Sequence, residues 1–162
     1  MRLNAALFAV GLAISPAATA QAPRPIAPAV QPAYDYGIAN PVPGRWTYGP
    51  TTTGSAASFA GSDGRRQLAL TCVRSTRRIS IARTAAGAAP FLMVWTSAQA
   101  RNVPAGFNPA TGLLSADLGA YDKLFDSLAF SRGRIAVGPS NAPALVAPAW
   151  PEIIRVIEDC RV

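Results

Sequence analysis

The chain has 162 residues, a formal net charge of +7 at pH 7 and no histidine. The absence of imidazole excludes histidine-based catalytic triads and histidine metal ligands. A chain of this length forms one domain, and its arginine excess favours anionic partners, although net charge speaks mainly to solubility and weak association.

The first 20 residues predict an export signal. Arg2 precedes an apolar run from Ala5 to Ile14, and Ala18 and Ala20 match the small residues of a signal-peptidase site. The run is too short to span a bilayer, and no later run reaches about 18 residues. We therefore expect a periplasmic or secreted protein with no transmembrane anchor in its mature form.

Residues 21–43 predict a disordered, proline-rich tail ahead of one globular domain at residues 44–162. Proline removes a backbone donor and biases the preceding residue away from helix. Tyr34, Asp35 and Tyr36 interrupt the tail and are candidates for local docking. The prolines of the tail are Pro23, Pro25, Pro28, Pro32, Pro41 and Pro43.

After Gly44 the sequence shows the period-2 alternation of half-buried strands. Residues 61–64, Gly-Ser-Asp-Gly, predict a turn. Residues 91–95 are apolar without alternation, which predicts a central strand covered on both faces. Trp46 and Tyr48 open the domain, and Ala57 and Phe59 continue the alternation. The inward positions of the next two strands are Leu68, Leu70, Cys72, Ile79 and Ile81, and further strands are expected near Val103, over 113–118, 134–138 and 144–147.

Two helices are expected. Tyr121, Leu124, Phe125 and Leu128 form one apolar stripe, with Gly133 beyond its end. A last helix begins at Pro151, a residue suited to the first helical position. Its expected inward stripe is Trp150, Ile153, Ile154, Ile157 and Cys160.

This order of elements predicts an α+β fold, a mainly antiparallel β-sheet with one inserted helix and one C-terminal helix. A small β-sandwich with helical caps is the alternative. Parallel α/β folds are disfavoured because few strands are separated by a crossover of sufficient length.

Cys72 and Cys160 are the only cysteines, and both are expected to face the core. In an oxidising compartment such a pair predicts a disulfide rather than a metal site. Closing a loop between residues 88 positions apart can stabilise a protein by about 4 kcal/mol. The absence of CxxC spacing disfavours a redox function.

Nothing in the sequence rises to a catalytic motif. Asp122 and Asp126 lie one helical turn apart and could share acid and base roles or bind a hard cation, but exposed helix carboxylates are common near a helix start. On the last helix, Arg155 is spaced to pair with Glu152 and Asp159, which favours a solvated outer face. No cofactor and no metal are expected.

An arginine-rich surface is the candidate binding site. If the strands on either side of residues 74–77 pair, guanidinium groups suited to phosphate or carboxylate cluster at one rim of the sheet. An anionic envelope lipid or glycan is then the expected partner, and nucleic acid is not, because no aromatic residues interleave with the cluster. A solvated edge that discourages strand addition is the alternative. The candidates are Arg65, Arg66, Arg74, Arg77, Arg78 and Arg83.

Four segments carry a resemblance: Trp46, Leu70-Thr71-Cys72, Ser131-Arg132-Gly133-Arg134, and the closing stretch from Trp150-Pro151-Glu152 to Glu158-Asp159-Cys160-Arg161. Over about residues 45–161 the chain resembles a group of small, uncharacterised exported bacterial proteins, which supplies no catalytic residues. In layout alone it is similar to invasion-associated locus B proteins. The resemblance implies an exported, cysteine-bridged, β-rich domain and no activity.

Two functions follow as hypotheses. The first is a non-catalytic periplasmic or secreted domain that binds anionic envelope components through its arginine-rich surface. The second is a carboxylate-dependent hydrolase acting on envelope glycans, with Asp122 and Asp126 as its first candidates.

Overall fold

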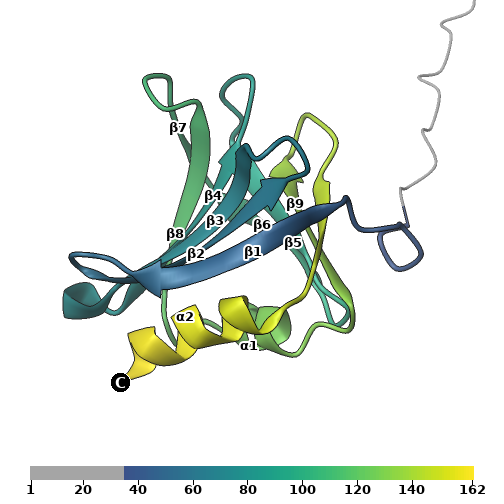
Figure 1. Ribbon diagram of the computed structural model, residues 1–162. Helices are drawn as coiled ribbons and strands as arrows, with labels where there is room; N and C mark the ends of the chain where they lie inside the picture. The colour runs from purple at the N-terminus through teal and green to yellow at the C-terminus, as the bar shows by residue number, and fades with distance from the viewer. Residues whose placement is uncertain (1–34) are drawn as a thin grey trace, which may run out of the picture. The chain divides into compact units, whose positions relative to one another are not determined.

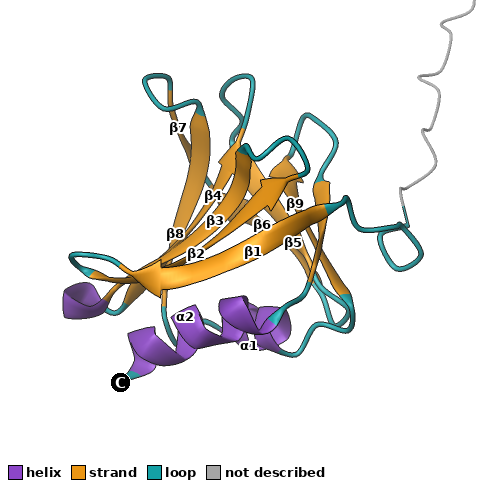
Figure 2. Cartoon of the chain, viewed as in Figure 1, coloured by secondary structure: helices purple, strands orange, loops and turns teal. Residues whose placement is uncertain are grey.

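The computed structural model describes residues 35–162 (Figure 1). The predicted export signal and residues 21–34 of the predicted tail lie outside the described residues. The described chain forms two antiparallel sheets and two α-helices (Figure 2). The predicted α+β class, with one inserted and one C-terminal helix, is confirmed.

Sheet A has the strand order β1-β2-β3-β4-β8-β7, and sheet B has the order β10-β9-β5-β6. The bounds in sheet A are β1 Gly44–Pro50, β2 Gly54–Gly61, β3 Arg66–Val73, β4 Arg78–Thr84, β7 Gly106–Asn108 and β8 Leu113–Gly119. Those in sheet B are β5 Phe91–Trp95, β6 Ala100–Pro104, β9 Arg134–Pro139 and β10 Leu145–Pro148. The helices are α1 Lys123–Ala129 and α2 Pro151–Arg161, and a short 3-10 helix, η1 Arg74–Thr76, joins β3 to β4.

The alternating pattern decides which side of sheet A is buried. Leu70 pairs with Ile81 and Cys72 with Ile79, and all four side chains are buried. The turn at residues 61–64 is present, and Gly64 adopts a φ of 73°, which glycine tolerates without a steric penalty. The predicted strands around the first cysteine are therefore confirmed.

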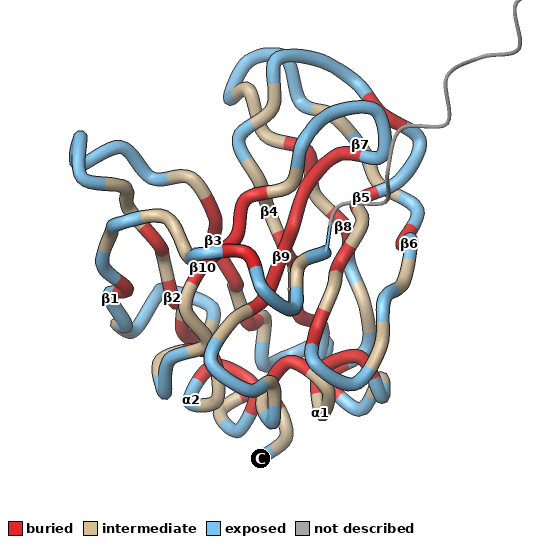
Figure 3. Tube along the Cα trace, turned by 90° about the vertical axis from the view of Figure 1, so that its right-hand side faces the viewer, coloured by how far each residue is buried: buried red, intermediate tan, exposed pale blue. Residues whose placement is uncertain are grey.

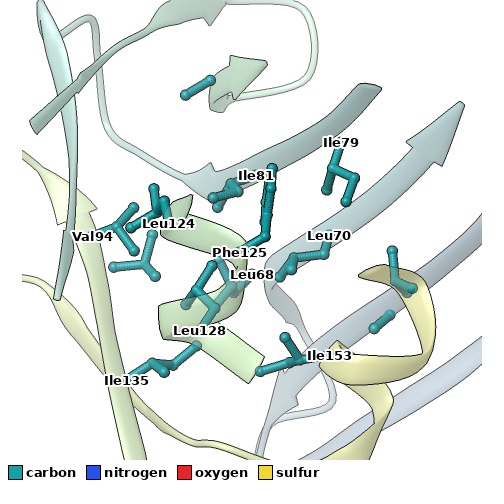
Figure 4. Packing of buried hydrophobic residues seen from close by; sticks show 14 of the residues in the cluster. Leu68, Leu70, Ile79, Ile81, Val94, Leu124, Phe125, Leu128, Ile135 and Ile153 are labelled. Carbon is teal, nitrogen blue, oxygen red and sulfur yellow. The ribbon is translucent and has the colours of Figure 1, made fainter. Parts of the chain in front are cut away.

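The two sheets meet at both margins, so that they enclose a common core. On one side only Ala105 separates β6 from β7, and on the other side Val42 N–H donates to Val146 O at 2.9 Å. Figure 4 shows buried side chains from both sheets and both helices converging, and Figure 3 shows that the exposed residues concentrate in the connections. The labelled members are Leu68, Leu70, Ile79, Ile81, Val94, Leu124, Phe125, Leu128, Ile135 and Ile153.

Strand β5 differs from expectation. It is an interior strand of sheet B, but only Leu92 and Val94 are buried, whereas Phe91 is exposed and Trp95 is half-buried. Its outer face is covered only in part, by the segment that precedes β1. The five consecutive apolar residues therefore alternate between buried and more exposed positions, although their identities do not show which is which.

The expected tail ended at Pro43, but residues 35–43 belong with the domain. Ala39 is buried against sheet B, the Tyr36 ring lies 6.0 Å from that of Trp95, and the Arg134 guanidinium donates to Ala39 O. Two aromatic rings and a backbone carbonyl supply these contacts, which proline content alone does not reveal.

Both helices lie together at one end of the sheets (Figure 1). Helix α1 begins at Lys123, so Tyr121 precedes it and is exposed. On α2 the buried stripe contains Val156, whereas Ile154 is half-buried and Trp150 is the exposed N-cap. The helix is therefore rotated slightly from the predicted stripe, while Cys160 faces the core as expected.

Candidate functional site: an arginine turn beside the C-terminal helix

The candidate site is the connection between β3 and β4, residues 74–78, which we call the arginine turn. Arg77 N–H donates to Arg74 O at 3.1 Å, and Arg77 itself is left-handed, with φ 48° and ψ 45°. Arg74, Arg77 and Arg78 are all exposed. Three exposed arginines therefore lie on one short, folded segment, and Arg78 Nη2 also donates to Asp117 O of β8 at 2.8 Å.

Three neighbouring segments hold the backbone of the arginine turn. Arg74 N–H donates to Thr53 O at 3.0 Å in the β1–β2 connection, and Arg77 O accepts from Ala120 N–H at 2.8 Å. The sulfur of Cys160 lies 3.3 Å from Arg78 O. The backbone of the turn is thereby held by the β1–β2 connection, by the β8–α1 connection and by α2.

The predicted disulfide is present and braces the same region. Cys72 of β3 is bonded to Cys160 of α2, and their Cα atoms are 5.6 Å apart. Cys72 lies two residues before the arginine turn, and Cys160 lies in the last turn of α2. The covalent link ties α2 to the strand from which the turn emerges.

A polar network on α2 adjoins the turn. Tyr48 O–H donates to Asp159 Oδ2 at 2.5 Å, and Arg74 Nη2 lies 3.7 Å from Asp159 Oδ1. The hydrogen bond to Asp159 raises the pKa of Tyr48, and the same bond lowers the pKa of Asp159, although burial opposes the latter effect. Tyr48 thus stays protonated and Asp159 ionised at neutral pH, so neither is poised for proton transfer there.

Ser55 and Arg155 complete this network. Ser55 Oγ is buried without a hydrogen bond of good geometry, yet it lies close enough to lower the pKa of both Tyr48 and Asp159. The Arg155 guanidinium stands 5.6 Å from the centroid of the Tyr48 ring. The sequence predicted that Arg155 pairs with Glu152 and Asp159; instead it packs over the aromatic ring and acts on Asp159 only through its charge.

The six predicted arginines do not form one cluster. Arg65 and Arg66 lie where β3 begins, and Arg74 lies where it ends. Eight residues of extended chain separate Arg66 from Arg74, which corresponds to about 26 Å. The hairpin therefore places its arginines at two opposite ends, because the length of the strands intervenes.

The guanidinium of Arg83 is engaged by backbone carbonyl oxygens and is not free to bind a ligand. Its Nη1 donates to Gln67 O at 3.2 Å and to Thr84 O at 2.9 Å. Burial lowers its pKa, and its Nε is buried without a partner. Arg83 thus links β3 to β4 and is not part of the candidate site.

The two aspartates expected to share acid and base roles are engaged separately. Asp122 is the N-cap of α1, accepting from Leu124 N–H at 2.9 Å and from Arg101 Nη1 at 2.6 Å. Asp126 pairs with Arg161 at 2.8 Å. Burial tends to raise the pKa of Asp122, but the hydrogen bonds from Arg101 and Leu124 outweigh it and lower the pKa. Each carboxylate is thus already engaged by an arginine, and these contacts support a structural role for both aspartates.

Metal and small-molecule sites find little support within residues 35–162. No three side chains of the His, Cys, Asp or Glu type come together there to hold a metal ion. A depression of about 190 Å³ is lined by residues 85–88, Pro139, Asn141 and Ala142. Ligand pockets usually measure about 300–1,000 Å³, so this depression is small for an organic ligand.

Sequence reasoning missed the hydroxyl groups beside the arginine turn. Thr51, Thr52 and Thr53 are exposed in the β1–β2 connection, where Thr53 O accepts from Arg74 N–H, and Ser75 and Thr76 are exposed within the turn. The run of three threonines was a visible signal. Its proximity to the arginines became evident only through the contact between Thr53 and Arg74.

Comparisons with known proteins give no relative: no family model, no curated protein and no solved structure matches the chain. In the part of the chain that the structure describes, no helix has both the length and the apolar character needed to cross a membrane. The site must therefore be interpreted from its own geometry.

Proposed function

We propose that this protein is a non-catalytic domain of the periplasm or the extracellular medium that binds anionic envelope components through the arginine turn. The observation that carries this proposal is the exposure of Arg74, Arg77 and Arg78 on a turn whose backbone is held by three other segments. The disulfide supports a location outside the cytoplasm, since such bonds persist in oxidising compartments.

The chemistry of the turn suits oxyanions. Guanidinium groups donate paired hydrogen bonds to phosphate or carboxylate, and the neighbouring threonine and serine hydroxyls supply further donors. Because the turn is already folded, binding orders side chains but little backbone, which lowers the entropic cost of association. Of the three arginines in the turn, it is Arg74 whose charge is partly neutralised by Asp159.

The test is retention of the purified, oxidised protein on immobilised heparin and on immobilised lipopolysaccharide. The variant carries Arg74→Glu, Arg77→Glu and Arg78→Glu, and we expect it to bind about tenfold or more weakly, since each charged hydrogen bond contributes more than a neutral one. A matched control carries Arg45→Glu, Arg65→Glu and Arg66→Glu, three exposed arginines outside the turn. The two variants have the same net charge.

Selective loss in the first variant supports the proposal. Unchanged retention in that variant, or an equal loss in both, would show that the arginine turn is not the binding site.

A further inference from the structure

We propose that the helical end of the domain docks on an anionic phospholipid surface. By the helical end we mean α1, α2 and the residues directly before and after them. This inference rests on the proposed function, because the arginine turn supplies the electrostatic attraction. It goes further by naming the bilayer as the source of the anionic groups and by adding an apolar contact that heparin does not offer.

The first observation is where large apolar side chains are exposed. Phe130, after α1, is 81% exposed, and Trp150, before α2, is 41% exposed. Within residues 35–162, most of the other exposed large apolar side chains also lie on or beside the helices. At the helical end these are Tyr121, Phe130, Trp150 and Val162, with Tyr48 beside α2, whereas Ile38 and Phe91 lie elsewhere.

The second observation is that Phe130 and Trp150 lie at the same end of the helix pair. Arg161 Nε donates to Ala120 O at 2.9 Å, and the Tyr121 hydroxyl donates to Arg161 O at 2.6 Å, so the end of α2 lies beside the residues just before α1. At the other end, Ala149 N–H donates to Gly133 O at 3.2 Å. The segment after α1 therefore meets the segment before α2 at Gly133 and Ala149, three residues after Phe130 and one residue before Trp150.

The third observation places the arginine turn within the same footprint. The turn touches the last turn of α2 through Cys160 and Arg78, and Trp150 precedes its first turn. An α-helix of 11 residues is about 16 Å long. Aromatic side chains and guanidinium groups are thus separated by about one short helix, with both helices and η1 on the same side of the sheets in Figure 1.

The combination fits a lipid interface. Aromatic side chains favour the headgroup level of a bilayer, and arginine binds the phosphates there. Isolated exposed apolar residues are normal on soluble proteins; here Trp150 and the exposed cations lie at the two ends of the same short helix. Three acids nearby are paired with arginine, namely Asp122, Asp126 and Asp159. Asp117 and Glu158 stay exposed and Glu152 is half-buried, so these acids reduce the positive charge of this end.

A bilayer suits this surface better than a shaped protein groove does. Phe130 and Trp150 are exposed side chains, and neither lines the described depression, which lies among the connections near β4 and β9. A soft lipid surface accepts separate projecting rings without requiring a complementary pocket.

The experiment uses the purified, oxidised protein and large unilamellar vesicles of phosphatidylglycerol mixed with phosphatidylcholine. We expect cosedimentation with these vesicles and little with phosphatidylcholine alone. Trp150 is the exposed tryptophan, whereas Trp46 is buried and Trp95 half-buried. Brominated lipids should therefore quench the native fluorescence, and this quenching should disappear in Trp150→Phe.

A double variant, Phe130→Ser with Trp150→Ser, tests the apolar contact. Serine is a favourable N-cap, so α2 should keep its start. We expect at least about tenfold weaker vesicle binding with unchanged retention on heparin. The control, Ile38→Ser with Phe91→Ser, removes two exposed apolar side chains elsewhere, 79% and 40% exposed, and should bind vesicles normally.

The outcomes separate the two proposals. If the native protein binds heparin but not vesicles, or if Phe130→Ser with Trp150→Ser binds vesicles as tightly as the native protein, the docking inference is wrong and the proposed function stands. If the arginine-turn variant keeps its heparin retention, the proposed function is wrong and this inference loses its electrostatic basis.

Discussion

The hydroxyl of Tyr48 donates a 2.5 Å hydrogen bond to Asp159, a residue 111 positions later in the chain. It joins the first strand of sheet A to the last helix, beside the disulfide. The same carboxylate lies 3.7 Å from Arg74. One titratable contact therefore connects the candidate binding turn to the packing of α2.

Tyr48→Phe should make stability less dependent on acid pH. The pKa of Asp159 lies below its usual value of 3.8, with the Tyr48 hydrogen bond as the largest cause. Stabilisation from a depressed carboxyl pKa is present above the unfolded pKa and is lost as the pH falls through the folded pKa. Urea unfolding should thus show that Tyr48→Phe lowers the free energy of unfolding at pH 7, and that this decrease becomes smaller near pH 2.

Tyr121→Phe is the matched control for that measurement. The Tyr121 hydroxyl donates to the carbonyl oxygen of Arg161 at 2.6 Å, and a carbonyl does not titrate. The decrease in the free energy of unfolding caused by Tyr121→Phe should therefore be similar at pH 7 and near pH 2. A Tyr48→Phe effect that is equally independent of pH would contradict the assignment.

Replacing Cys72 and Cys160 together by alanine should lower the free energy of unfolding by about 4 kcal/mol, because the bond closes a long loop in the unfolded chain. Urea unfolding with and without dithiothreitol measures this. Reductant should destabilise the native protein to a similar extent and leave the double variant unchanged. Equal stability of the native protein under both conditions would argue against a structural bond.

Asp122→Ala should cost about 1 kcal/mol or more, because it removes both an N-cap and the partner of Arg101. Asp126→Ala should cost less, about 0.2–1 kcal/mol, because it breaks one partly exposed ion pair. Thermal unfolding compares them, and Asp122→Asn should recover part of the capping. A larger loss from Asp126→Ala would reverse the ranking.

Gly54→Ala should destabilise the domain by about 1–3 kcal/mol through overpacking. A Cβ at this position would lie 2.4 Å from Cys72 O, whereas one at Gly49 would meet nothing within 4 Å. Gly49→Ala is therefore the control, and urea midpoints should rank it above Gly54→Ala. Similar midpoints would mean that β2 and β3 can separate locally at little cost.

Much of the fold was predictable because it depends on local periodicity. Leu68, Leu70 and Cys72 face one side of a strand by the period of two, and Leu124, Phe125 and Leu128 share a helix face by the period of 3.6. The prediction was weaker for residues 91–95, where every side chain is apolar and identity does not distinguish the two faces.

The candidate site was predictable only in part. Arg74, Arg77 and Arg78 are close in sequence, so a turn keeps them together. Arg65, Arg66 and Arg83 were grouped with them because a hairpin was correctly expected, but its strands separate its two ends. Thr53 came beside Arg74 through a contact between two connections, which no periodicity indicates.

The sequence by itself determined the buried side chains of β3, β4 and α1, and it determined the pairing of two cysteines that both face the core. These properties follow from the backbone geometry of a single element. Only the tertiary structure decided that Tyr48 meets Asp159 and that the segment after α1 meets the segment before α2 through Gly133 and Ala149. Such contacts depend on how separate sheets and helices pack, because distances between elements are set by the shared core and not by spacing along the chain.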